Sequence, residues 1–224
     1  ADGSVQPEAV IRFSLLSALT ARNDDPEGAS RPFEKTRDGF VMSEGAAALV
    51  LESLEHATAR GAIVLGIVSG CGERADSFHR TRSNPNGQAI IGAMRNAIED
   101  AGLQPADIGY VNAHGTSTPL NDATESAAIE ACFGEQAGKL LVSSTKSMTG
   151  HMLGAAGAFE AVLSLLALNE GIAPPTIGLI EEDEVCRLNY VKGKAQKLDS
   201  DYALSNSFGF GGHNSCLLLK RGGR

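Results

Sequence analysis

The feature that most constrains the fold of this chain is a regular alternation of strand-like and helix-like segments from residue 62 onward. Short apolar runs predict strands at 63–69, 108–111, 140–143, 188–191, 203–207 and 216–219. Helical spacing of apolar residues predicts helices at 88–101, 122–132 and 152–169. Strands that alternate with helices pack as layers, with helices covering a sheet, so we expect an α/β layered domain.

The first sixty residues have a different texture. Their patterns predict a helix within 7–21, two short buried strands at 40–41 and 46–51, and a helix at 53–60 closed by Gly61. We therefore expect a boundary between two packed units near Gly61. Residues 1–60 and 61–224 would then be separate parts of the structure.

Composition and charge exclude several classes of protein. The chain has 42% hydrophobic and 21% charged residues, which is enough apolar surface for a core. Its formal charge of -8 opposes general binding to nucleic acid or to an anionic membrane. The most apolar stretch, 152–168, contains Glu160 and is better interpreted as a buried helix than as a membrane span. We expect no nucleic-acid partner and no membrane insertion.

Cysteine spacing argues against a disulfide framework or a zinc site. The four cysteines are scattered and form no Cys-x-x-Cys pair: Cys71, Cys132, Cys186 and Cys216. Free, buried thiols in a reducing compartment are expected instead. No metal site is predicted.

Two histidines lie where a predicted strand gives way to a loop. His114 follows the strand at 108–111, and His151 lies beyond the strand at 140–143. Ligands of open α/β sheets bind at the carboxyl ends of strands, and the neighbouring Gly115 and Gly150 allow close approach. Either histidine alone could equally well cap its strand through a hydrogen bond. Two in the same topological position favour a site.

A third segment, Ser205 to Asn214, contains glycines around Phe208 and Phe210. Such a turn can present backbone N–H groups to a ligand, although by itself it more often only connects strands.

Together these segments closely resemble the signatures of the β-ketoacyl-acyl-carrier-protein synthases, with the elongating types I and II of fatty acid synthesis most similar. The matching stretches lie at 112–118, 145–157 and 206–212, and flanking matches at 30–33, 37–41 and 174–177 extend the resemblance over nearly the whole chain. The resemblance implies the thiolase-like fold, two similar halves stacked as α-β-α-β-α layers. This chain would supply the second half and the tail of the first.

The chain departs from the family pattern at the nucleophile. In the family an upstream cysteine lies at the amino end of a buried helix, and none of the four cysteines here has that context. We therefore expect a carboxyl-terminal fragment without its first roughly 180 to 200 residues, inert alone. His213 stands where many members have threonine, and no catalytic role is assigned to it.

The implied reaction is a decarboxylating Claisen condensation of acyl-carrier with malonyl-carrier, both held on the phosphopantetheine arm of acyl carrier protein, with no other cofactor. The implied partners are acyl carrier protein, the amino-terminal half and a second copy in a homodimer. The implied location is the bacterial cytoplasm, or else an organelle.

The resemblance also assigns roles to residues. His114, His151 and Lys146 would be catalytic. Glu160, Asp122 and Glu125 would form a supporting network, Phe210 and Gly209 the oxyanion hole and gate, and Thr116, Thr118 and Phe208 the substrate-binding wall. Taken without the resemblance, Lys146 could be an exposed surface lysine, and Asp122 and Glu125 would suit any helix N-terminus.

Two other functions share this fold. A thiolase would carry a Cys-x-Gly segment near the carboxyl end, which Cys216 does not supply. A non-catalytic partner subunit of the chain-length-factor type would contribute only pocket shape, and the retention of both histidines and the lysine weighs against it.

Overall fold

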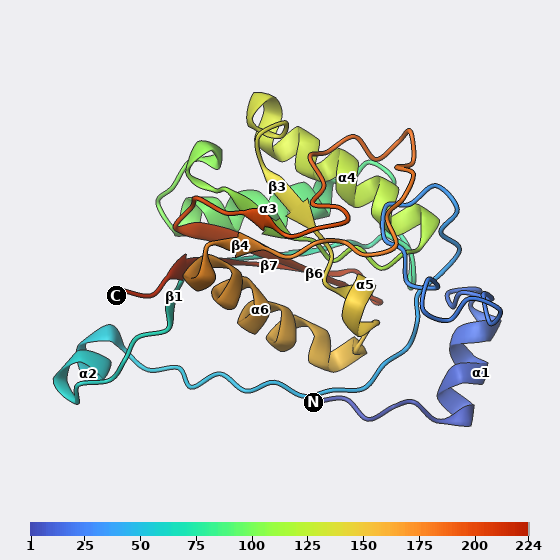
Figure 1. Ribbon diagram of the computed structural model, residues 1–224, viewed down its shortest axis with the longest axis horizontal. Helices are drawn as coiled ribbons and strands as arrows, with labels where there is room; N and C mark the ends of the chain where they lie inside the picture. Colours follow the sequence, from blue (N-terminus) through green and yellow to red (C-terminus); the bar gives the residue numbers. More distant parts are fainter. Residues whose placement is uncertain (224) are drawn as a thin grey trace.

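The computed structural model describes residues 1–223, and Figure 1 shows the arrangement of its elements. The helices are α1 (Pro7–Leu15), α2 (Leu54–Ala59), α3 (Gln88–Asp100), α4 (Pro119–Phe133), α5 (Lys146–Thr149) and α6 (Ala156–Glu170). The strands are β1 (Gly66–Ala75), β2 (Tyr110–Asn112), β3 (Leu141–Ser143), β4 (Ile172–Ala173), β5 (Gln196–Lys197), β6 (Tyr202–Gly209) and β7 (His213–Arg221).

The centre of the molecule is a mixed five-stranded sheet in the order β1-β7-β6-β2-β3. Strand β2 is parallel to both β3 and β6, whereas β7 is antiparallel to β6 and to β1. Helices α3 and α4 lie on one face of this sheet and α6 lies on the other (Figure 1). The expected α/β layering is confirmed.

The apolar runs in the central strands follow from this sandwich. Every residue of β2 is buried, and so are Ala203 to Asn206 of β6, because helices cover both faces of the strands. On β1, glycines let α3 approach closely. A Cβ at Gly70 would lie 2.2 Å from the carbonyl oxygen of Ala97, and one at Gly72 would lie 1.9 Å from that of Ala93.

Glycine also follows long helices that flank the sheet. Gly102 follows α3 with a φ of +66°, and Gly171 follows α6 with a φ of +67°, a left-handed conformation that glycine adopts without steric cost. Helix α4 begins at Pro119, three residues before the predicted start, because proline suits the first helical position.

Several expectations for local structure are wrong. Residues 46–51 form no strand, because no backbone partner for them lies within residues 1–223. Val50 and Leu51 of this segment are 87% and 73% exposed. Residues 188–191 contribute only an isolated bridge from Tyr190 to Val142. The first helix ends at Leu15, since Ser17 takes a positive φ of 53°.

All four cysteines are free, as expected, but they are not all buried. Cys132, Cys186 and Cys216 are buried, whereas Cys71 is exposed. Cys71 lies on β1, which has only β7 beside it, and it points away from α3 because its neighbours Gly70 and Gly72 face that helix.

Residues Leu153–Glu170 are long and apolar enough to cross a membrane by length and composition alone. Helix α6 packs on β6 and β7, however, and contains the buried Glu160, features typical of the core helix of a globular domain. The predicted interpretation of this stretch as a core helix fits these contacts.

Candidate active site

The His114 loop is held from below by one buried carboxylate. Strand β2 ends at Asn112, and Glu125 of α4 accepts hydrogen bonds from the backbone N–H groups of His114 and Gly115, both at 2.8 Å. Asn206 of β6 donates a third hydrogen bond to Glu125 at 3.1 Å. Burial raises the pKa of Glu125 to about 7, while the three donors stabilise its charged form.

Asp122, one turn earlier on α4, fixes the next stretch of the same loop. Its carboxylate accepts the backbone N–H groups of Thr116 at 3.0 Å, Ser117 at 3.1 Å and Phe33 at 2.9 Å. Ser117 is fully buried with a positive φ of 70°, a conformation that costs energy and needs such support. Asp122 and Glu125 therefore hold the loop in place. An acid that only stabilised the N-terminus of its helix would not need these contacts with the loop.

Arg37 supplies the charge that accompanies Asp122. Its Nε lies 3.5 Å from Asp122 and its Nη1 lies 2.7 Å from Asp183, and the side chain is almost fully buried. Sequence reasoning assigned no role to Arg37 or to Asn206. Both residues lie within stretches that match the family signatures, and that match is the one sequence signal that points to them.

His151 is oriented by residues from the first sixty positions. Its backbone N–H donates to the carbonyl oxygen of Val41 at 2.8 Å, and its backbone carbonyl accepts the N–H of Ser43 at 3.1 Å. Its ring Nδ1 accepts the N–H of Leu153 at 3.2 Å. The neutral ring therefore carries its proton on Nε2.

The two imidazoles meet at the floor of a cavity of about 810 Å³. The ring centroids of His114 and His151 are 5.3 Å apart, with an interplanar angle of 84°. The ring centroids of Phe208 and His114 are 5.4 Å apart, and those of Phe40 and His151 are 5.1 Å apart, both in a T-shaped arrangement. A cavity of this size suits a small-molecule substrate.

Burial keeps both histidines neutral near pH 7. It lowers the pKa of His151 to about 3 and that of His114 well below its ordinary value, and the positive charge of Lys146 acts in the same direction. A neutral imidazole can donate one N–H to an oxygen that gains negative charge.

Lys146 is not a surface lysine. It is 1% exposed and forms an ion pair with Glu160, which projects from α6 and is itself buried. Burial raises the pKa of Glu160, while Lys146 opposes that shift. A paired charge of this kind beneath a pocket is expensive to bury, so it is a candidate for function.

The glycine-rich segment forms the tight turn between β6 and β7 and closes one side of the cavity. Phe208 is buried and lines the cavity, and Gly209 also lines it. Phe210 is 47% exposed, and its ring lies 6.2 Å from that of Phe13. Thr116 and Thr118 also line the cavity, with their hydroxyls 2.9 Å apart.

The fold therefore brings together the side chains named from the sequence. Seven line the cavity, namely His114, His151, Thr116, Thr118, Phe208, Gly209 and Phe210. The other four, Lys146, Glu160, Asp122 and Glu125, are buried around it. Within residues 1–223 no cysteine lines the cavity, and no group of three His, Cys, Asp or Glu side chains is arranged to hold a metal ion.

Comparison with known proteins agrees with this geometry. The description "Beta-ketoacyl synthase, C-terminal domain" matches residues 65–179, and the corresponding N-terminal domain matches residues 1–57. The chain is 51% identical to 3-oxoacyl-[acyl-carrier-protein] synthase 2 of Coxiella burnetii over 215 residues, and 49% identical to that of Synechocystis over 220 residues. It spans about half the length of these curated relatives, 52% and 53%.

Solved structures show the same fold. A β-ketoacyl synthase from Burkholderia phymatum superposes with a TM-score of 0.93 at 43% identity, covering 98% of this chain and 53% of that one. A ketosynthase complex containing a type II polyketide acyl-carrier protein gives a TM-score of 0.96 at 35% identity, covering 99% of this chain and 54% of its match.

Fold and pocket together define a protein of the thiolase-like class, with a sheet between helical layers and a histidine pair in the segments that follow two adjacent parallel strands. Within that class the chain belongs to the β-ketoacyl synthase family.

Proposed function

We propose that this chain is the carboxyl-terminal part of an elongating β-ketoacyl-acyl-carrier-protein synthase, an acyltransferase that condenses acyl-carrier with malonyl-carrier. The observation that carries the proposal is the pair of neutral histidines, with ring centroids 5.3 Å apart, that line one cavity. Two N–H donors held close together suit a reaction that develops negative charge on one oxygen.

The chemistry uses these residues as follows. An acyl group is held as a thioester on a cysteine supplied by the preceding half. Malonyl thioester loses carbon dioxide, and the electrons of the breaking carbon–carbon bond move onto the thioester oxygen as an enolate. His114 and His151 donate to that oxygen. The enolate carbon then attacks the acyl carbonyl, the cysteine thiolate leaves, and a β-ketoacyl thioester is formed.

Lys146 contributes a positive charge beneath the histidines. Its charge lowers the pKa of both imidazoles, which keeps them neutral. The same charge would stabilise the negative enolate oxygen. Phe210 and Gly209 would provide the gate and one oxyanion donor, while Thr116 and Thr118 would hydrogen-bond the phosphopantetheine arm. Asp122, Glu125 and Glu160 would hold this geometry.

The remaining parts of the proposal concern partners and boundaries. The complete enzyme, meaning this chain joined to the half that carries the cysteine, would be a homodimer served by acyl carrier protein in the bacterial cytoplasm. Residues 1–60 would complete the first thiolase-like half and 61–224 would form the second. The exposed Val50 and Leu51 support this, since they offer apolar surface for a neighbouring element.

The complete enzyme should condense acyl-carrier with malonyl-carrier without added metal or nucleotide, because the cavity supplies donors and a cation from its own side chains. The measurement is β-ketoacyl product formation after dialysis against a chelator, with full activity expected. A strict requirement for a divalent cation at the reaction step would contradict the proposed chemistry.

Replacing Phe210 with alanine should alter acyl transfer more than stability. The side chain is half exposed, so its loss should cost less than about 1 kcal/mol of unfolding free energy. The turn contains Gly211 and Gly212, at positive φ of 90° and 80°, which can absorb backbone movement if the ring moves as a gate.

Acylation of the cysteine and the unfolding midpoint are measured side by side for this variant. Phe208→Ala, which removes a buried wall residue of the same kind, serves as the comparison and should lower the midpoint more. A collapsed midpoint for Phe210→Ala with unchanged acylation per folded molecule would make Phe210 a packing residue.

A further inference from the structure

The mouth of the cavity carries positive charge although the protein as a whole is acidic. The segment between β1 and α3, residues 76–84, borders the cavity with His79, Thr81, Arg82 and Ser83. The chain has 27 acidic residues, yet within residues 1–223 none of them lines this cavity. An anion that enters would therefore meet Arg82 without a competing carboxylate in the lining.

The segment is fixed against the glycine-rich turn, so Arg82 has a defined place. The N–H of Asp76 donates to the carbonyl oxygen of Gly212 at 2.8 Å, and the N–H of Gly211 donates to that of Arg80 at 2.7 Å. The Asp76 carboxylate is occupied by two backbone N–H groups, those of Phe78 at 2.9 Å and Asn84 at 2.7 Å.

The Arg82 guanidinium has no protein partner in the described part of the chain. It forms neither an ion pair nor a side-chain hydrogen bond there, whereas Arg31, Arg37 and Arg60 each pair with a carboxylate. His79 beside it accepts the N–H of Thr81 on Nδ1 at 3.2 Å. Its neutral ring would then carry a proton on Nε2, which is a second donor at the mouth.

We propose that Arg82, with His79 beside it, binds the phosphodiester of the phosphopantetheine arm. The proposal rests on the function proposed above and adds a specificity residue to it. The thioester end of the arm must reach the histidine pair at the buried floor, so the opposite, anionic end remains at the mouth. A planar guanidinium matches a phosphate through two parallel hydrogen bonds.

The malonyl carboxylate is the other anion of the substrate, and its place is different. It must leave as carbon dioxide from a carbon next to the thioester, beside His114 and His151. The exposed Arg82 therefore faces the part of the substrate that takes no part in bond making. Its effect should appear in KM and leave kcat unchanged, since the contact is the same in the ground state and the transition state.

The test compares two small substrates on the complete enzyme, malonyl-phosphopantetheine and malonyl-pantetheine, which differ only in the phosphate. The unmodified enzyme should prefer the phosphorylated substrate by roughly three- to tenfold in kcat/KM at low salt, and by less at high salt. Arg82→Gln should bring that preference below about twofold, because kcat/KM falls more for the phosphorylated substrate than for malonyl-pantetheine. Arg82→Lys should keep part of the preference.

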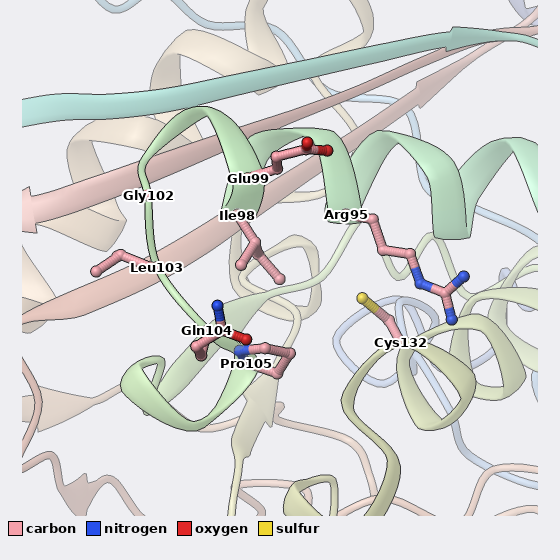
Figure 2. A pocket seen from close by; sticks show the side chains of 8 residues that line it. All are labelled: Arg95, Ile98, Glu99, Gly102, Leu103, Gln104, Pro105 and Cys132. Carbon is pink, nitrogen blue, oxygen red and sulfur yellow. The ribbon is translucent and has the colours of Figure 1, made fainter.

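Arg95→Gln is the matched control. Arg95 is also an exposed arginine, but it lies on α3 beside a separate depression of about 420 Å³ whose lining includes Cys132 and shares no residue with the active-site cavity (Figure 2). This variant should keep the full preference for the phosphorylated substrate.

Three outcomes would overturn the inference. Arg82→Gln could retain the phosphate preference, or Arg95→Gln could lose it equally. Arg82→Gln could also weaken use of malonyl-carrier while the two small substrates respond alike, which would assign Arg82 to acidic side chains of the carrier. If the unmodified enzyme decarboxylates neither small substrate nor malonyl-carrier, the proposed function itself fails. Normal activity without phosphate selectivity contradicts only the role of Arg82.

Discussion

Replacing His114 or His151 with alanine in the complete enzyme should each lower malonyl decarboxylation by about 10²- to 10³-fold. In the proposed function each ring supplies one N–H to the enolate oxygen, and a donor already fixed where the charge develops contributes an effect of this size. Acylation of the cysteine should fall much less, because no enolate forms in that step. The two steps are measured separately, as carbon dioxide release and as acyl-enzyme formation.

His56→Ala is the control for loss of a histidine, because His56 lies on the exposed helix α2 outside the cavity. It should leave both steps unchanged. Wild-type decarboxylation by His114→Ala and His151→Ala together would make these residues strand caps and remove the main support for the proposed function.

The pH dependence gives an independent check on the histidines. Because the pKa of His151 is lowered to about 3, decarboxylation should show no titration of this ring between pH 5 and 8. Stability should respond with a defined sign. The unfolded histidine binds a proton below about pH 6.5 and the folded one does not, so the contribution is full above that pH and is lost as pH falls toward 3.

Much of the fold could be predicted from the sequence because its long elements have clear periods. Helix α3 combines regular apolar spacing with a following glycine and was predicted nearly at its observed bounds. Helix α6 is apolar on most sides, and its predicted start at 152 lies four residues before the observed one. The segment 46–51 shows the limit of this reasoning. Its apolar residues predict a buried strand. Within residues 1–223, however, no surface covers Val50 or Leu51.

The candidate site divides in a similar way. The sequence indicated that His114 and His151 follow strands, and their meeting results from the parallel pairing of β2 with β3. Contacts between distant segments could not be predicted from local patterns. The backbone hydrogen bond from His151 to Val41 and the ion pair of Arg37 with Asp122 each join the first sixty residues to later segments of the chain.

These contacts bear on how the enzyme is assembled. Phe40 packs against the His151 ring, and the carbonyl of Val41 accepts the backbone N–H of His151, so residues 40 and 41 help to set the orientation of this ring. The position of the histidine pair therefore depends on contacts from the first sixty residues. This explains why residues 1–60 and the later segments form one cavity in the structure.

Replacing Lys146 with methionine should have the largest effect on stability, about 3–5 kcal/mol of unfolding free energy in the complete enzyme. The change leaves the carboxylate of Glu160 buried without its cation, and Glu160 Oε2 already has no hydrogen-bond partner. Without Lys146 the pKa of Glu160 rises further. The loss should therefore be smaller at pH 5 than at pH 8, because the protonated acid is cheaper to bury.

A second substitution separates the structural from the catalytic role of this pair. In Lys146→Met with Glu160→Leu, both charges are replaced by apolar groups of similar volume, so most of the lost stability should return. Decarboxylation should remain at least about tenfold below wild type, because the cation beneath the histidines is still absent. Lys35→Met, which breaks the exposed pair with Glu181, should cost less than about 1 kcal/mol.

Unfolding by denaturant and carbon dioxide release from malonyl-carrier are measured for all three variants. A double variant that regains both stability and activity would show that Lys146 only balances Glu160. A single variant as stable as wild type would show that the pair contributes nothing. Recovery of stability without activity is the expected result, since burying a charged pair under an enolate site is useful only if the positive charge acts on the reaction.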